Sequence, residues 1–276
     1  MNDTLTKRMP PPQGREAMPG LFARVRHKLA SHLPVSPFNA SSDAPAVSFT
    51  FDDCPVSSVT EGAALLEEAG ARGTYYVAGS LLGTTMTEWQ VMSAGQVVDL
   101  HARGHEIGCH SHSHTRADLL TAEEIEADTV RNHALLRAIE PTLPLQNFAY
   151  PYGQTTMTCK RQLDRHYRSS RGIRPRVNVG ATDAQFLHSV PLIDREIDES
   201  GIDRAFEAAV REKGWLIFYS HDVAASPSLY GCTPRLMRHA LKAAERFGVQ
   251  VETVNATLTR IGARISTLWL MSLPLI

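Results

Sequence analysis

Short apolar runs alternate with helix-like amphipathic stretches along most of the chain, beginning at Ala46. The runs that we expect to form strands span residues 47–51, 73–77, 106–108, 147–149, 215–219 and 250–254. The stretches that we expect to form helices span residues 59–68, 96–102, 121–139, 202–213 and 234–246. This alternation predicts parallel strands joined by crossover helices, in a barrel or a doubly wound sheet.

The two ends of the chain differ from this pattern. Residues 1–45 are rich in proline, glycine and charge, which predicts a flexible extension with a short basic amphipathic helix at 21–33. Residues 46–260 form the predicted folded domain, and residues 261–276 form an apolar tail. We expect the tail to pack on the domain, with a partner subunit or a membrane surface as alternatives. Neither a signal peptide nor a membrane-spanning stretch is evident, so we expect a cytoplasmic protein, with association at a membrane surface as the alternative.

Composition narrows the class of protein. The 276 residues carry a formal net charge of -1, which argues against a broad nucleic-acid-binding surface. We interpret the local basic cluster at 161–176 as a solvated face. The four cysteines lie far apart without CxxC spacing, which argues against a disulfide framework or a structural zinc knot.

Two of the predicted strands end in side chains that suit a metal site. Asp52 and Asp53 follow the first strand, and His110 and His114 follow the third. Histidines four residues apart on a helical turn lie on one side, about 5–6 Å apart at Cβ. With a carboxylate from another strand they form a three-ligand site with an open position, as in catalytic zinc centres. The alternative is a histidine-rich tract that faces solvent.

Two further strand ends add polar groups to the same edge of the predicted sheet. The sequence YPYG at 150–153 predicts a stiff turn, which can aim a backbone N–H at a developing negative charge. His221 follows the strand at 215–219. A single histidine in that position is commonly a core residue, so the case for chemistry depends on all four strand ends together.

With these motifs in place, the chain resembles the polysaccharide deacetylases with a NodB homology domain, which are carbohydrate esterase family 4. The matching stretches are TFDD at 50–53, HSxxH at 110–114, YPYG at 150–153 and IFYSHD at 217–222. They occur in the family's order, and the resemblance covers about residues 46–258. It implies an α/β fold, namely a distorted (β/α)7 TIM-like barrel, and one divalent metal ion, usually zinc.

The resemblance also implies a role for each matching residue. The residues that match metal ligands are Asp53, His110 and His114. Those that match catalytic groups are Asp52 as general base, His221 as general acid and the backbone N–H of Tyr152 as oxyanion donor. Those that match substrate contacts are Tyr150, Pro151 and Tyr219, and Ser111 is expected to hold the histidine loop by hydrogen bonding.

The chain departs from the family pattern at three places. The family usually has an arginine at the position of Ala149, which orients the base, and Arg195 is the candidate to replace it. The family's Asp-x-x-Asp-Trp motif has its nearest match at 191–198. Tyr219 stands where a leucine often lines the pocket for the acetyl methyl group.

The function that we expect is metal-dependent hydrolysis of the acetamido groups of N-acetylated sugars, making the protein a hydrolase of carbon–nitrogen bonds in linear amides. The sugar could be a polymer, an oligosaccharide or a lipid-linked precursor. Two alternatives stay open. One is hydrolysis of a small non-sugar amide with the same groups, and the other is a carbohydrate-binding relative without turnover.

Overall fold

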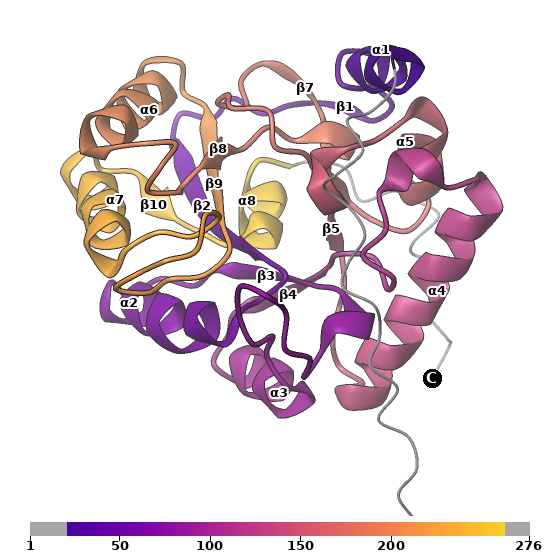
Figure 1. The fold of residues 1–276 in the computed structure, drawn as a ribbon. Helices are drawn as coiled ribbons and strands as arrows, with labels where there is room; N and C mark the ends of the chain where they lie inside the picture. The colour runs from indigo at the N-terminus through magenta and orange to yellow at the C-terminus, as the bar shows by residue number, and fades with distance from the viewer. Residues whose placement is uncertain (1–20, 263–276) are drawn as a thin grey trace, which may run out of the picture.

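The computed structural model describes residues 21–262, and its centre is a curled sheet of parallel strands (Figure 1). The strand order is β6-β5-β4-β3-β2-β9-β8, and β10 pairs with the start of β2. The bounds are β2 Ala46–Asp52, β3 Thr74–Val77, β4 Glu106–Cys109, β5 Asn147–Ala149, β6 Ser169–Arg171, β8 Val190–Pro191, β9 Trp215–Ser220 and β10 Gln250–Val251.

Leu187 closes this sheet into a distorted barrel. Its N–H donates to the carbonyl of Ser170, and its own carbonyl accepts from the N–H of Gly172, both at 2.9 Å. The chain then continues into β8, which pairs with β9. The segment 187–191 therefore pairs with β6 at one end and with β9 at the other, and it occupies the position of the seventh strand of the barrel. The predicted (β/α)7 fold is confirmed.

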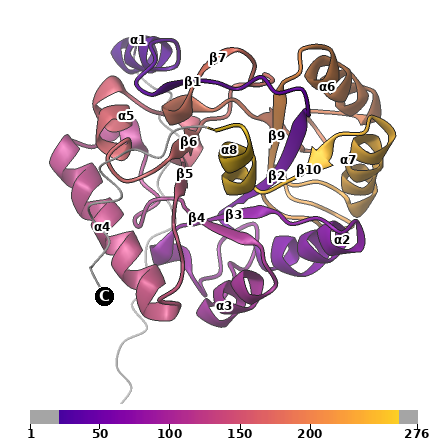
Figure 2. The ribbon, with the colours of Figure 1, turned by 180° about the vertical axis from the view of Figure 1, so that it is seen from behind.

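Helices cover the outside of the barrel, as Figures 1 and 2 show. Their bounds are α2 Ala63–Glu68, α3 Ala94–Ala102, α4 Ala122–Ile139, α5 Met157–Leu163, α6 Glu199–Arg211, α7 Pro234–Arg246 and α8 Val254–Arg260. A five-residue π-helical segment, Ser58–Gly62, leads into α2. Within residues 21–262, none of the helices combines the length and apolar character that crossing a bilayer requires.

Local sequence signals explain where several helices begin. α4 starts at the expected capping box, in which the Thr121 hydroxyl accepts from the N–H of Glu124 and the Glu124 carboxylate accepts from the N–H of Thr121. The strand expected at 250–254 is shorter than predicted, because the Thr253 hydroxyl accepts from the N–H of Ala256 and caps α8. α8 then covers one end of the barrel (Figure 2), where Val254 packs with Trp215.

Buried apolar side chains connect the central strands of the barrel to the helices outside it. Every residue of β2 is buried, as expected for a strand of a parallel sheet that is covered on both faces. Phe49 packs against Phe218, whose ring lies 5.9 Å from that of Phe206 on α6. Because all strand pairings in the barrel are parallel, the carboxyl ends of β2, β4, β5, β6 and β9 meet at one rim.

The segment before the barrel is more ordered than the sequence predicts. α1, Leu21–Ala30, confirms the expected basic helix, and β1, Pro37–Asn39, pairs antiparallel with β7, Ala181–Asp183. The buried Lys160 ammonium donates to the carbonyls of Ala30 at 2.7 Å and Leu33 at 2.6 Å, and it pairs with Asp183. Residues 21–45 therefore pack on the barrel instead of forming a flexible arm. Residues 1–20 and 263–276, including most of the predicted tail, lie outside the described residues.

We predict that Lys160→Met destabilises the protein by about 3 kcal/mol, because it leaves the Asp183 carboxylate without its cation and two carbonyls without a donor. The lower denaturation midpoint should be accompanied by faster proteolysis between residues 24 and 44. Lys213→Met is the matched control, since Lys213 forms an exposed pair with Asp43, and it should leave the midpoint unchanged. Equal midpoints for the two variants would contradict this role of Lys160.

Candidate active site and metal centre

The rim of the barrel carries an unusual concentration of backbone strain. Seven non-glycine residues of the described chain have a positive φ, and five of them lie in the loops after β2, β4 and β5. These five are Asp53, Cys54, Ser111, His114 and Tyr152. The left-handed conformation costs roughly 1–2 kcal/mol for each such residue, and strain of this kind collects at functional sites.

Hydrogen bonds from side chains hold the histidine loop in this conformation. The Ser111 hydroxyl accepts from the N–H of His114 at 2.9 Å, which confirms the expected role of Ser111. The Asp128 carboxylate on α4 accepts from the N–H groups of His112 at 2.6 Å and Ser113 at 3.0 Å. Sequence analysis did not single out Asp128, because a carboxylate on an amphipathic helix has no distinguishing local pattern.

Asp53, His110 and His114 come together as a candidate metal centre. One ligand atom from each lies within 4.8 Å of the others. The Nε2 atoms of His114 and His110 lie 2.9 Å and 3.6 Å from Oδ1 of Asp53. All three side chains are largely buried. Two imidazole nitrogens and one carboxylate oxygen are a donor set suited to a catalytic zinc ion, so these residues fit the predicted cation.

The surroundings of His110 set its tautomer. Its Nδ1 lies 2.8 Å from the carbonyl of Ala149, and a carbonyl only accepts, so Nδ1 carries the proton. The lone pair of Nε2 is therefore directed toward Asp53, which is the orientation that a metal-ligating histidine would need. Burial lowers the pKa of His110 to about 4, which keeps this imidazole neutral at neutral pH. Burial opposes the ionisation of Asp53, but the facing His114 holds the carboxyl pKa below its ordinary value.

Asp52 forms a buried ion pair with Arg171, at the end of β6. The Arg171 side chain is fully buried, and its guanidinium carbon lies 5.2 Å from the ring centroid of Tyr76 and 5.4 Å from that of Tyr219. Burial alone would raise the pKa of Asp52. Nearby positive charges, of which the Arg171 guanidinium has the largest effect, instead hold this pKa below its ordinary value. Asp52 is therefore ionised at neutral pH.

The cation beside Asp52 is Arg171, and it does not come from the position of Ala149, where the resemblance predicts an arginine. In the sheet register Arg171 pairs directly with Ala149, so the charge comes from the neighbouring strand. The expected substitute, Arg195, is wrong, because its side chain is 47% exposed and pairs with Glu196. Interpreting 161–176 as a solvated face is also wrong for Arg171, which is fully buried.

His221 follows β9, next to the strand that carries Asp52. Its Nδ1 lies 3.2 Å from the carbonyl of Tyr230, and a carbonyl only accepts, so the proton is on Nδ1. In the neutral imidazole Nε2 then carries the lone pair. The indole ring of Trp89 lies over the imidazole at a centroid distance of 5.5 Å, and the Tyr230 ring lies 5.8 Å away. Trp89 and Tyr230 come from loops far apart in sequence, and sequence analysis identified neither.

The side chains of the YPYG turn differ in their surroundings. Tyr150 is buried, and its hydroxyl donates to the carbonyl of Gln185 at 2.8 Å, so its side chain packs in the core. Pro151 is also buried. The ring of Tyr152 packs beside His114, with 3.3 Å between its hydroxyl and Nδ1. Tyr219 packs against Arg171.

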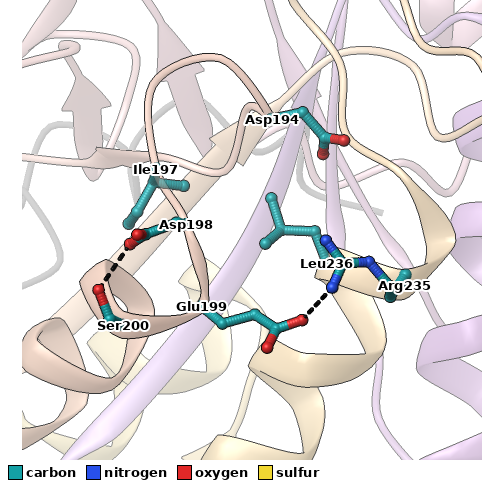
Figure 3. A pocket seen from close by; sticks show the side chains of 7 residues that line it. All are labelled: Asp194, Ile197, Asp198, Glu199, Ser200, Arg235 and Leu236. Carbon is teal, nitrogen blue, oxygen red and sulfur yellow. Dashed lines mark hydrogen bonds and ion pairs between the residues drawn. The ribbon is translucent and has the colours of Figure 1, made fainter.

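The segment 191–198, the nearest match to the missing family motif, contributes to a shallow pocket (Figure 3). Its lining residues are Asp194, Ile197, Asp198, Glu199, Ser200, Arg235 and Leu236. The polar groups pair with one another, since Glu199 accepts from Arg235 and Asp198 accepts from Ser200. Asp198 also caps α6, and Asp194 accepts from the N–H of Thr233. These acids have structural roles.

Comparison with known proteins agrees with the motifs. Residues 39–167 match the family model described as polysaccharide deacetylase. No curated protein matches the chain.

Several solved structures share the fold. A family 4 acetyl xylan esterase from Clostridium thermocellum, in complex with a cobalt ion, is 21% identical, with a TM-score of 0.57 over 79% of this chain and 93% of the esterase. A peptidoglycan N-acetylglucosamine deacetylase is 15% identical, with a TM-score of 0.57 over 80% of this chain and 91% of the deacetylase. A carbohydrate esterase family 4 pseudoenzyme from Bacillus anthracis is 14% identical, with a TM-score of 0.56 over 82% of this chain and 69% of the pseudoenzyme. The family match covers residues 39–167, just under half of the chain, and the similar structures share the fold of this chain.

Proposed function

We propose that the protein is a metal-dependent deacetylase that hydrolyses the N-acetyl groups of a saccharide. The observation that carries this proposal is the convergence of two sets of groups at one rim. Asp53, His110 and His114 form a compact donor set, and the adjacent residue Asp52 is held ionised by Arg171. A non-catalytic protein has no evident need for a buried, ionised carboxylate beside three potential metal ligands.

The metal centre of this proposal consists of Asp53, His110 and His114. Zinc suits two nitrogens and one carboxylate oxygen with a position left open, and other divalent ions such as cobalt accept the same donors. When bound, such a cation supplies Lewis acidity, which polarises an acyl carbonyl and makes water more acidic.

Asp52 is the general base of the proposed reaction. Its pKa lies below the ordinary carboxyl value, so at neutral pH it is ready to accept a proton from the attacking water. Arg171 acts through Asp52 as a positioning residue. It fixes the carboxylate by a charge-assisted hydrogen bond, and its own guanidinium contacts the rings of Tyr76 and Tyr219.

Tyr152 and His221 complete the proposed chemistry. The left-handed conformation of Tyr152, with its ring against His114, supports a role for its backbone N–H in stabilising the developing oxyanion. His221 as an imidazolium donates a proton to the departing amine from Nε2, while Nδ1–H stays bound to the Tyr230 carbonyl. The names of the similar structures, an acetyl xylan esterase and a peptidoglycan deacetylase, support an acylated saccharide as substrate.

Acetate release from N-acetylglucosamine oligomers, with zinc or cobalt added, tests the proposed function directly. We expect chelator to abolish release, and Asp52→Asn to abolish it while metal content stays unchanged, because Asp53 and not Asp52 is the ligand. Asp99→Asn, an exposed carboxylate on α3, is the control and should behave as the wild type. Release only from small amides would favour the small-amide alternative. No release with any metal would indicate a binding protein, and loss of metal from Asp52→Asn would assign Asp52 to the metal.

The role of Arg171 predicts a change in pH dependence. A base held at low pKa stays active until the pH falls through that pKa, so removing the neighbouring cation should move the loss of activity to higher pH. We expect Arg171→Met to shift the acidic limb of kcat/KM upward by about one pH unit or more, with Arg171→Lys giving a smaller shift. Arg211→Met, which removes an exposed guanidinium paired with Glu212, should leave the profile unchanged. A lower rate at every pH with an unshifted limb would show that Arg171 only stabilises the fold.

Removing the imidazole of His221 should lower the turnover number and leave substrate binding nearly unchanged. We expect His221→Ala to lower kcat by about 10²–10⁴-fold and to change KM little, since the proton is needed only when the amine departs. Steady-state kinetics with a defined oligomer measures both constants. His239→Ala on α7 controls for loss of a partly exposed imidazole. Near-normal kcat in His221→Ala would remove it from the mechanism.

A further inference from the structure

The outward face of α1 carries a stripe of apolar side chains. Val25, Leu29 and Leu33 are 49%, 52% and 50% exposed. They are spaced four residues apart. Val25 and Leu29 lie on one face of α1, and Leu33 follows in the turn after the helix, where its N–H donates to the carbonyl of Leu29 at 2.9 Å and so continues that face. Exposed apolar side chains that occur singly need no explanation, but an ordered stripe on one helix marks an interaction surface.

The opposite face of α1 is fixed to the barrel, so the helix cannot rotate to bury this stripe. Ala30 is fully buried, and the Nδ1 of His27 accepts from the N–H of Thr155 at 3.3 Å. The Lys160 ammonium donates to the last carbonyl of the helix, that of Ala30. At 3.6 residues per turn, Val25 and Leu29 lie on the side away from His27 and Ala30. The stripe therefore points away from the barrel.

Positive charges flank the stripe on both sides. Arg24, Arg26 and Lys28 are exposed, with Arg26 on one side of Val25 and with Arg24 and Lys28 on the other. The sequence contains no acidic residue between Glu16 and Asp43. In a chain with a net charge of -1, this segment is locally cationic.

We propose that α1 is an interfacial helix that docks on an anionic membrane surface. Val25, Leu29 and Leu33 enter the boundary between head groups and acyl chains, and the flanking cations contact anionic head groups. A second copy of the chain fits this face poorly. A symmetric contact through the stripe brings the same arginines and lysine of both copies together, and like charges there oppose association.

Co-sedimentation of the full chain with lipid vesicles tests this proposal. We expect binding to vesicles of phosphatidylcholine with phosphatidylglycerol, little binding to phosphatidylcholine alone, and weaker binding at higher salt. The variant Val25→Ser/Leu29→Ser/Leu33→Ser should lose at least about tenfold in affinity. The variant Arg24→Gln/Arg26→Gln/Lys28→Gln should lose about fivefold for each cation removed.

A matched triple variant separates the stripe from general surface hydrophobicity. Leu119, Val130 and Val210 are exposed apolar residues on other elements, and replacing all three by serine should leave vesicle binding unchanged. Hydrolysis of soluble oligomers and the unfolding midpoint should be the same in all three variants, since none touches the proposed site. These measurements keep a failure of docking distinct from a failure of the proposed catalysis.

Four results would overturn the proposal. The first is that the wild type binds neither type of vesicle, and the second is that it binds equally to vesicles with and without phosphatidylglycerol. The third is that the Val25→Ser/Leu29→Ser/Leu33→Ser variant binds as the wild type does. The fourth is a wild-type dimer in analytical ultracentrifugation that the α1 serine variant abolishes, which would make this face a contact between copies of the chain.

Discussion

The buried ion pair between Asp52 and Arg171 is the interaction on which the rest of the site depends. It joins the end of β2 to the end of β6, two strands that are not neighbours in the barrel. Removing either partner leaves an uncompensated charge in the interior, which is far more costly than losing a surface pair. The rings of Tyr76 and Tyr219 near the guanidinium favour the cation and restrict its orientation. The pair therefore constrains both the shape of the barrel and the position of the carboxylate.

This pair also explains how two adjacent carboxylates coexist in a buried place. Asp52 is the last residue of β2 and faces Arg171, whereas Asp53 adopts a left-handed conformation and faces the imidazoles of His110 and His114. Each carboxylate thus has its own positively charged or proton-bearing partner, which offsets the repulsion between them. The change of backbone conformation between two consecutive residues separates their roles.

Much of the fold could be predicted because many of its strands and helices have a recognisable local sequence pattern. The apolar runs of β2 and β9 and the capping box of α4 each carry a signal within a few residues. β6 carries no such signal, since its Ser169, Ser170 and Arg171 are polar but buried. Their partners come from elsewhere in the chain, namely Asn147, Gln185 and Asp52. A pattern-based analysis cannot recognise a buried polar strand until the residues that satisfy it are known.

The same reasoning separates the parts of the site that were predictable from those that were not. His110 and His114 could be recognised because their spacing suits two ligands of one cation, and the resemblance to the family then selected Asp53 as the third member of the candidate site. Arg171 could not, because the site requires a positive charge at a point in space and two neighbouring strands can each deliver it. With Ala149 on β5, the charge comes from the residue paired with it on β6. The electrostatic field at Asp52 depends on where the positive charge lies and not on which strand carries it. A pattern along the sequence therefore does not identify the arginine, and only the three-dimensional pairing of Arg171 with Asp52 does.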